Sequence, residues 1–455
     1  MSKKHLTLAI SMILLLSMLL AACGGAEPTP APAAEPAAGE TPAAPAPAAA
    51  EPVTLRLLVH QNPPMVEFMQ SFNDKFTANN PNIKVDMAVV NASELATATQ
   101  TRLTANDVDL IDIFGFANPA QPYMKNVDKP NWQQLIEAGL LSDLTGQPFV
   151  SNYAPASNKD AGTWDGKVYQ VNLGRVIYSG IYYNKDIFKA NNIAVPTTWG
   201  ELVAACETLK AADIPCMTAG GKDGWPIFVG AYGLIGSLFP EQAALVEGLW
   251  TGSTKWNDAK SMEMWEKMKV YAQDMMEPEA SGIAGDAAPG RFASGAVAMF
   301  SGGSWYASAI EAANPTFEWG YIPFPGSDNA EDNKYLFGKY DQGWAIAANS
   351  PNQEAAAAYL TEFSDPANYQ AFANAVGFIP TQPTATLDTQ IGKEVAAFLD
   401  NFRVGYEQYW VAPKGAGEFA NPWASYYKPF GTFDDAQELA NKVQSDLQSG
   451  LDASK

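Results

Sequence analysis

Clustered and alternating apolar positions predict a strand, a helix and a second strand soon after residue 52. Residues 53–60 (VTLRLLVH) are apolar enough for a buried strand, and residues 83–90 (IKVDMAVV) alternate apolar and polar side chains. Between them, aromatic residues recur on one face of a predicted helix: Phe68, Phe72 and Phe76. Strand, helix, strand in so short a segment is a βαβ unit, whose strands are parallel. With a third apolar strand at residues 109–115, the pattern predicts an α/β fold.

Three later helices have recognisable N-termini. Thr198-Trp-Gly-Glu201 has the spacing of a capping box and predicts a helix to about residue 211. Ser350-Pro-Asn-Gln353 predicts a hydroxyl cap followed by Pro at the first helical position. Asp365-Pro predicts one more helix start.

Residues 1–22 have the pattern of a secretory signal peptide. Lys3 and Lys4 precede a short apolar run, and small residues follow it up to Cys23. The ending Leu-Ala-Ala-Cys resembles a bacterial lipobox, which implies cleavage before Cys23 and attachment of lipid to it. A plain signal peptide with an incidental Cys23 is the alternative.

Residues 23–52 predict a disordered linker. After the Cys this segment is nearly all Ala, Pro, Glu and Thr, which bury too little apolar surface to offset the entropy of ordering. Its prolines favour an extended spacer. From Val53 onward about 400 residues remain, which is too long for one core and suggests two lobes. No later stretch has the length of a membrane-spanning apolar segment.

Charge and cysteine content narrow the partners. The net charge of −21 disfavours nucleic acid as a partner, because nucleic acid needs basic side chains against its phosphates, and it also disfavours polyanionic substrates. It is compatible with neutral ligands such as sugars, or with cations. Outside the cytoplasm, Cys206 and Cys216 form either a disulfide or two buried thiols, and the sequence leaves both open. No spacing of Cys and His predicts a zinc site.

Several catalytic constellations are missing from the sequence. Once the leader is removed, His60 is the single histidine, and no nucleophile lies near it in the sequence. The chain has neither a GxSxG nor a GxxxxGK motif. By contrast it has 12 Trp, many of them beside Gly, Asn or Pro in turn-like settings. Flat aromatic faces suit the apolar faces of sugar rings, so we expect several of these residues to line a cleft while the rest are core.

Four segments in order along the chain carry a family resemblance. Residues 164–201 contain WDGKVYQVNLGRVIYSGIYYNKDIF and PTTWGE, and residues 291–305 read RFASGAVAMFSGGSW. Residues 321–326 (YIPFPG) and 377–380 (GFIP) follow. In this order they resemble the signatures of extracellular solute-binding proteins of ABC importers, in the sugar-binding cluster related to maltose-binding protein. Residues 171 and 172 (Val-Asn) depart from the family, which commonly has Pro there, and this puts the first hinge in doubt.

The resemblance implies a periplasmic-binding-protein-like fold with two α/β lobes joined by a hinge. Each lobe is built from discontinuous chain, the first from residues 53–172 and 322–377, the second from 173–321 and 378–455. Ligand would lie between the lobes at the carboxyl ends of their strands.

The resemblance also implies function. We expect a non-catalytic monomer without cofactor or metal that binds a carbohydrate, in particular an oligosaccharide, and delivers it to ABC permease subunits. Lipid on Cys23 would hold it at the outer face of the cytoplasmic membrane. A lipid-anchored glycoside hydrolase with two paired carboxylates, or a surface adhesion protein with a large exposed apolar patch, are the alternatives. Polyols, glycerol phosphodiesters and peptides stay open as ligands.

The resemblance places ligand contacts after the strands and in the crossing segments. The expected ligand-binding residues are Gln61, Asn62, Phe116, Asn118, Arg175, Tyr178, Trp225, Trp305, Tyr340, Asp341, Trp344 and Trp410. Asp341 would accept from two sugar hydroxyls, and Arg175 would donate to a ring or hydroxyl oxygen. A structural ion pair between Arg175 and Asp341 is the alternative role for these two residues.

Overall fold

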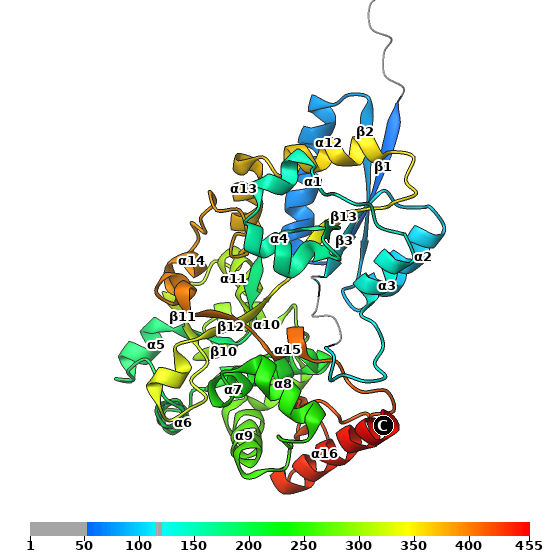
Figure 1. The fold of residues 1–455 in the computed structure, drawn as a ribbon. Coiled ribbons are helices and arrows are strands. Elements are labelled where there is room, and N and C mark those ends of the chain that lie inside the picture. The colour runs from blue at the N-terminus through cyan, green and yellow to red at the C-terminus, as the bar shows by residue number, and fades with distance from the viewer. Residues whose placement is uncertain (1–51, 115, 117–120) are drawn as a thin grey trace, which may run out of the picture. The chain divides into compact units, whose positions relative to one another are not determined.

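The computed structural model describes residues 52–114, 116 and 121–455, and Figure 1 shows how their helices and strands are arranged. The predicted signal peptide, Cys23, the linker up to residue 51 and Asn118 lie outside the described residues. The described part combines helices with several sheets, which confirms the predicted α/β class.

The first sheet contains the predicted βαβ unit. Its strand order is β2-β1-β3-β13-β6, with bounds β1 (Val53–His60), β2 (Ile83–Val90), β3 (Leu110–Phe114), β13 (Gln342–Ile346) and β6 (Val171–Asn172). β1 is parallel to β2, as predicted, and also to β3, whereas β13 is antiparallel to both β3 and β6. A strand from late in the chain therefore lies between two strands from its first half.

Two further sheets and a hairpin complete the strands. The second sheet has the order β11-β8-β10-β9, with bounds β8 (Gly180–Asn184), β9 (Met217–Thr218), β10 (Met299–Ser301) and β11 (Trp319–Pro323). The third sheet, β14-β12-β7, joins β7 (Arg175–Ile177), β12 (Leu336–Tyr340) and β14 (Phe402–Val404). β4 (Thr163–Trp164) pairs with β5 (Lys167–Val168). The third sheet combines segments that we assigned to both lobes, and the division into lobes stays a prediction.

Helices account for most of the other regular structure. In the first half they are α1 (Pro63–Asn79), α2 (Leu95–Thr104), α3 (Asn131–Glu137), α4 (Pro155–Gly162), α5 (Lys185–Ala190), α6 (Trp199–Ala211) and α7 (Trp225–Leu238). They continue with α8 (Gln242–Thr251), α9 (Ala259–Val270), α10 (Ala288–Ala293), α11 (Ala307–Ala312), α12 (Gln353–Phe363), α13 (Pro366–Val376), α14 (Gln390–Val395), α15 (Tyr406–Tyr409) and α16 (Ala436–Ala453). In the part of the chain that the structure describes, no helix combines the length and apolar character needed to cross a bilayer.

The aromatic face of α1 packs as its spacing predicts. Phe72 and Phe76 are buried, and both rings contact Tyr359 of α12 edge-on, with centroids 5.2 and 5.0 Å away. Each buried aromatic side chain of this kind contributes about 1.5–3 kcal/mol to stability. This contact packs α1 against α12 in the hydrophobic core on one face of the first sheet.

Two of the three predicted helix starts are confirmed. The capping box of α6 is present, because Glu201 N–H donates to Thr198 Oγ1 (3.3 Å) and Thr198 N–H donates to Glu201 Oε2 (3.2 Å). Asp365 caps α13 by accepting from Ala367 N–H at 3.0 Å.

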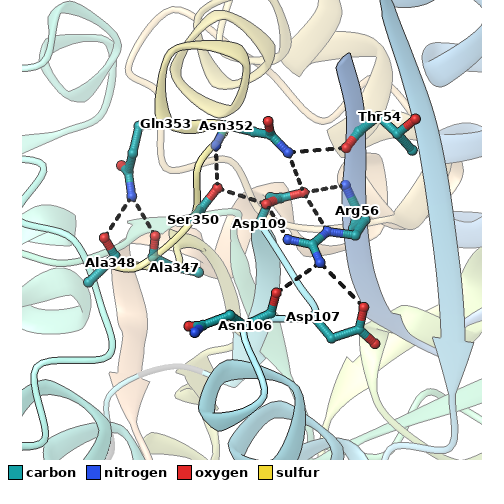
Figure 2. Close-up of polar contacts among 10 residues, drawn as sticks. All are labelled: Thr54, Arg56, Asn106, Asp107, Asp109, Ala347, Ala348, Ser350, Asn352 and Gln353. Atoms are coloured by element: carbon teal, nitrogen blue, oxygen red, sulfur yellow. Dashed lines mark hydrogen bonds and ion pairs between the residues drawn. The ribbon is translucent and has the colours of Figure 1, made fainter. Parts of the chain in front are cut away.

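The predicted hydroxyl cap at Ser350 is wrong. Helix α12 begins at Gln353, and the residue in its cap position is Asn352. Figure 2 shows that the Ser350 hydroxyl instead donates to Asp109 Oδ1 (2.7 Å) while accepting from Asn352 N–H (2.9 Å). These two bonds, one of them to the buried Asp109 carboxylate just before β3, hold Ser350 in a turn that precedes the helix.

Asp109 connects β1, the start of β3 and the segment before α12. Arg56 of β1 donates to both of its oxygens, from Nη2 (2.8 Å) and Nε (3.0 Å), and the Asn352 amide donates to Oδ2 at 3.2 Å (Figure 2). Burial favours the neutral acid, but these donors outweigh it and hold the pKa of Asp109 below its ordinary value. The contact lies at the amino end of β3, opposite the edge described next.

A disulfide joins Cys206 of α6 to Cys216, which precedes β9. Their Cα atoms are 5.1 Å apart, within the usual range for a bridge. Of the two arrangements that the sequence left open, the structure has the bridge.

Candidate functional site

The carboxyl ends of β1 and β3 meet the start of β13 at one edge of the first sheet. β1 and β3 are parallel neighbours, and Phe114 at the end of β3 lies opposite Gln342 at the start of β13. This register brings residues that follow β1 and β3 close to those that precede β13. Ligands of open α/β sheets bind at such carboxyl edges. The candidate site is therefore this edge and the segments that face it.

Gln61, Asn62 and Phe116 lie at this edge in different environments. The Gln61 side chain is exposed, and its backbone N–H donates to Val90 O at 2.6 Å. Asn62 is the N-cap of α1 and accepts from Met65 N–H at 3.4 Å. Phe116 is buried and stacks on Trp132, with centroids 4.3 Å apart. Of these three, Gln61 has the side chain most available to a ligand.

Asp341 pairs with a residue that the sequence analysis did not single out. Lys339 Nζ lies 3.2 Å from Asp341 Oδ1 and 3.6 Å from Glu407 Oε1 of α15. No ion pair between Arg175 and Asp341 occurs among the described residues, so the pairing that we considered from the sequence is replaced by this one. Lys339 and Asp341 are two residues apart, which puts both side chains on one face of an extended segment. This two-residue spacing was the sequence signal from which the pairing of Lys339 with Asp341 could have been predicted.

Lys339 stays protonated at this position. Burial lowers its pKa, but Glu407 and Asp341 raise it more strongly, and the result lies above its ordinary value. The ammonium also lies over the Phe114 ring, 5.4 Å from its centroid. This cation therefore contacts the end of β3, the segment before β13 and helix α15 at once.

Arg175 and Tyr340 are cross-strand neighbours in the third sheet. They pair in the register of β7 and β12, and the Arg175 guanidinium lies over Phe402 of β14, 4.9 Å from its ring centroid. Burial lowers the pKa of Arg175, and no acidic side chain pairs with it among the described residues. Burial, followed by the charge of Asp160, raises the pKa of Tyr340. Their strands, β7 and β12, each lie in the chain between a strand of the first sheet and a strand of the second.

Tyr178 and Trp344 are core residues in this structure. Tyr178 is 1% exposed and its ring lies 5.2 Å from that of Tyr232, while Trp344 is fully buried against Tyr359 and Phe363. Trp344 points into the core because side chains alternate along β13. Neither side chain presents a surface to a ligand here, and a contact would need a different conformation.

An aromatic cluster lies at the start of α7. Trp225 is 38% exposed, and its ring is nearly parallel to that of Tyr306 (9°, centroids 6.3 Å apart). Trp305, in the short helix η5 (Ser304–Tyr306), lies 6.3 Å from Trp225 and packs against three of the hydrophobic cores. We call Trp225, Trp305 and Tyr306 the aromatic cluster.

Two further tryptophans, Trp423 and Trp410, stack on neighbouring aromatic rings. Phe228, one turn after Trp225, stacks on Trp423 at 4.8 Å and 15°. Trp410 stacks on Tyr406 at 5.4 Å, and no described residue bonds to its buried indole N–H. The structure brings Trp225 and Trp305 together in the aromatic cluster, whereas Trp410 packs on Tyr406, which is not part of that cluster.

A buried polar pair at the edge was not predicted as a site. His60, the last residue of β1, directs Nδ1 to Asp112 Oδ2 at 2.7 Å, and both residues are buried. A carboxylate accepts only, so the Gln342 amide must face it through nitrogen, which then lies 2.8 and 3.0 Å from the two Asp112 oxygens. Position at a strand end was the one sequence signal for His60.

In the described part of the chain, neither a cluster of metal ligands nor the two hollows given below identify the candidate site. Among the described residues no group of three or more His, Cys, Asp or Glu side chains could hold a metal ion. A hollow of about 490 Å³ lies between α16 and the segment before α9, and one of about 410 Å³ lies beside β11; neither is lined by an expected ligand contact.

Comparison with known proteins gives a consistent result. A family profile described as bacterial extracellular solute-binding protein matches residues 72–398. The multiple sugar-binding protein of Streptococcus mutans is 27% identical over 294 residues, which cover 63% of this chain and 65% of that protein. The chain thus spans just under two thirds of this relative's length.

Solved structures match over most of the chain. RafE, which is from Streptococcus pneumoniae, in complex with raffinose has a TM-score of 0.70 at 22% identity, covering 88% of this chain and 99% of RafE. A chitin oligosaccharide binding protein has the same TM-score at 19% identity, with 88% and 99% covered. At such identities these matches establish the fold, which is periplasmic-binding-protein-like.

Proposed function

This chain belongs to the bacterial extracellular solute-binding protein family, and from that premise we propose that it captures an oligosaccharide and delivers it to an ABC permease. The sugar-binding name of the Streptococcus mutans relative and the raffinose and chitin oligosaccharide neighbours support a saccharide ligand. The net charge of −21 fits a neutral ligand better than an anionic one.

The aromatic cluster is the observation that carries the sugar assignment. Trp225 exposes 38% of its surface although large apolar side chains are usually buried. Its ring is supported from within by Tyr306 and Trp305. A flat apolar face held in one orientation can stack on the apolar face of a sugar ring without paying much conformational entropy.

We propose that the two predicted lobes close over the ligand. The third sheet combines strands from both, and Lys339 links the segment before β13 to Glu407 of α15. A ligand that contacts both sides stabilises the closed state by the difference between its affinities for the two states. In this proposal lipid on Cys23 and the linker of residues 23–52 keep the monomer near its permease at the outer face of the membrane.

A sugar panel tests this function. We expect raffinose, stachyose or a chitin oligosaccharide to raise the midpoint of thermal unfolding, because a ligand that binds only the folded state stabilises it. Isothermal titration calorimetry then measures Kd. The absence of both a thermal shift and binding heat with every sugar would contradict the proposal, and release of reducing sugar would point to a glycoside hydrolase instead.

Trp225→Ala tests the aromatic cluster. We expect Kd to rise by roughly thirtyfold, the effect of removing an aromatic anchor worth about 2 kcal/mol. Val89→Ala is the matched control, since Val89 is similarly exposed at 39% and lies in β2, outside the aromatic cluster. Equal affinity of Trp225→Ala and wild type would remove the cluster from the site.

A further inference from the structure

His60 occupies a buried position at the carboxyl edge where we place the ligand. It ends β1 opposite Val90 of β2, and 6% of its surface is exposed. Its ring lies 5.1 Å from that of Phe114 at the end of β3. It is the single histidine of the described residues.

Hydrogen bonds determine which ring nitrogen of His60 carries the proton. Asp112 is fully buried and its carboxylate can only accept, so Nδ1 must donate to it across 2.7 Å. The backbone N–H of His60 donates to the same carboxylate (3.3 Å), and the Gln342 amide nitrogen lies beside both Asp112 oxygens and 2.9 Å from Nδ1. Because Nδ1 carries its proton toward Asp112, the amide donates to the carboxylate alone. These contacts hold the ring in one orientation and leave Nε2 as the nitrogen with no partner among the described residues.

Charged groups on three segments act on His60. They are Asp112 on β3, Lys339 on β12, and Asp341 between β12 and β13. Burial and Lys339 oppose protonation, but the two carboxylates outweigh them and raise the pKa of His60 above its ordinary value of 6.5. The imidazole therefore keeps its proton to a higher pH than a free histidine side chain does.

We infer that His60 is a specificity-determining ligand contact, whose Nε2 hydrogen-bonds a hydroxyl of the bound sugar and makes sugar affinity depend on pH. The inference rests on the proposed function. Protonated Nε2 donates a charge-assisted hydrogen bond to the hydroxyl oxygen, whereas neutral Nε2 accepts a weaker one from the hydroxyl proton. The ligand class this selects is a polyhydroxylated, uncharged saccharide rather than an apolar solute.

The test measures the Kd of raffinose, stachyose and a chitin oligosaccharide by calorimetry from about pH 5.5 to about pH 8.5. We expect the sugar that binds to do so roughly fivefold more tightly at the acidic end, because hydrogen bonds to charged groups are stronger than neutral ones. His60→Phe should bind weakly and without pH dependence. Val90→Ala, altered at the paired position in β2, should behave as wild type.

Asp112→Asn keeps the inference falsifiable if His60→Phe does not fold. An amide in place of the carboxylate no longer stabilises the imidazolium, so sugar binding should continue with its pH dependence lost. Binding of a sugar with equal Kd across the pH range, or a wild-type Kd in His60→Phe, would overturn the role of His60 alone. Absence of binding to every sugar would overturn the proposed function and this inference together.

Discussion

At the scale of single residues, Asp109 shows how one buried carboxylate organises a sheet. Replacing it by Asn keeps its shape but removes the buried charge partner of the Arg56 guanidinium, which retains only the exposed Asp107. Arg56 is 26% exposed and can recover some solvation, so we expect a loss of about 2 kcal/mol, below the usual range for a fully buried pair. Urea unfolding of the variant and wild type measures it.

The pH dependence of stability follows from the same contact. The pKa of Asp109 is depressed in the folded state, so its contribution is present above the ordinary value of 3.8 and is lost as pH falls through the folded pKa. Stability of Asp109→Asn should therefore converge on that of wild type in acid. Glu137→Gln, at the exposed Lys129–Glu137 pair, is the control and should change stability less than Asp109→Asn does, because solvent screens an exposed ion pair. A gap that is unchanged in acid would contradict the assignment.

The candidate site was only partly predictable residue by residue. Gln61 was predicted from its position after one strand and Asp341 from its position before another, and both lie at one edge of the first sheet, because position next to a strand is local in sequence. The partner of Asp341 and the pairing of His60 with Asp112 depend on register between distant strands, which no local pattern encodes. Trp344 shows the same limit, because β13 is buried on both faces by segments distant in sequence.

At the scale of elements, segments with their own signals were predicted best. The βαβ unit, the capping box of α6 and the start of α13 each depend on neighbouring residues, and the structure confirms them. The Ser350 cap failed because the chain turns once more at Ser350, which bonds Asn352 N–H and the distant Asp109, before α12 begins at Gln353. The third sheet could not be predicted at all, since β7, β12 and β14 come from widely separated segments.

The disulfide gives a prediction for α6 and β9. Cys206 and Cys216 close a loop over a sequence separation of 10, and fixing a loop of this length stabilises a fold by roughly 2–3 kcal/mol through the unfolded state. We expect dithiothreitol to lower the unfolding midpoint of wild type in urea. A Cys206→Ala, Cys216→Ala double variant should start from the lower midpoint and be insensitive to the reductant. A wild-type midpoint in that variant would show that the bridge contributes nothing.

At the scale of the whole molecule, closure is the property that the proposed function requires. We expect the radius of gyration from small-angle X-ray scattering to decrease when a binding sugar is added, since hinge closure brings the lobes together. Glu407→Gln weakens the contact to Lys339 across this region and should change the ligand-free radius more than the bound one. A radius that sugar leaves unchanged would argue against closure even if binding occurs.

The placement of β13 has a consequence for biosynthesis. Hydrogen bonds of β3 and β6 along their facing sides have to wait for residues 342–346, which the ribosome makes long after both strands. Until then the nascent chain carries an open strand edge beside β3, the kind of surface on which unrelated chains aggregate. A protein with this strand order benefits from remaining unfolded during export, because β13 can then insert between β3 and β6 on the far side of the membrane.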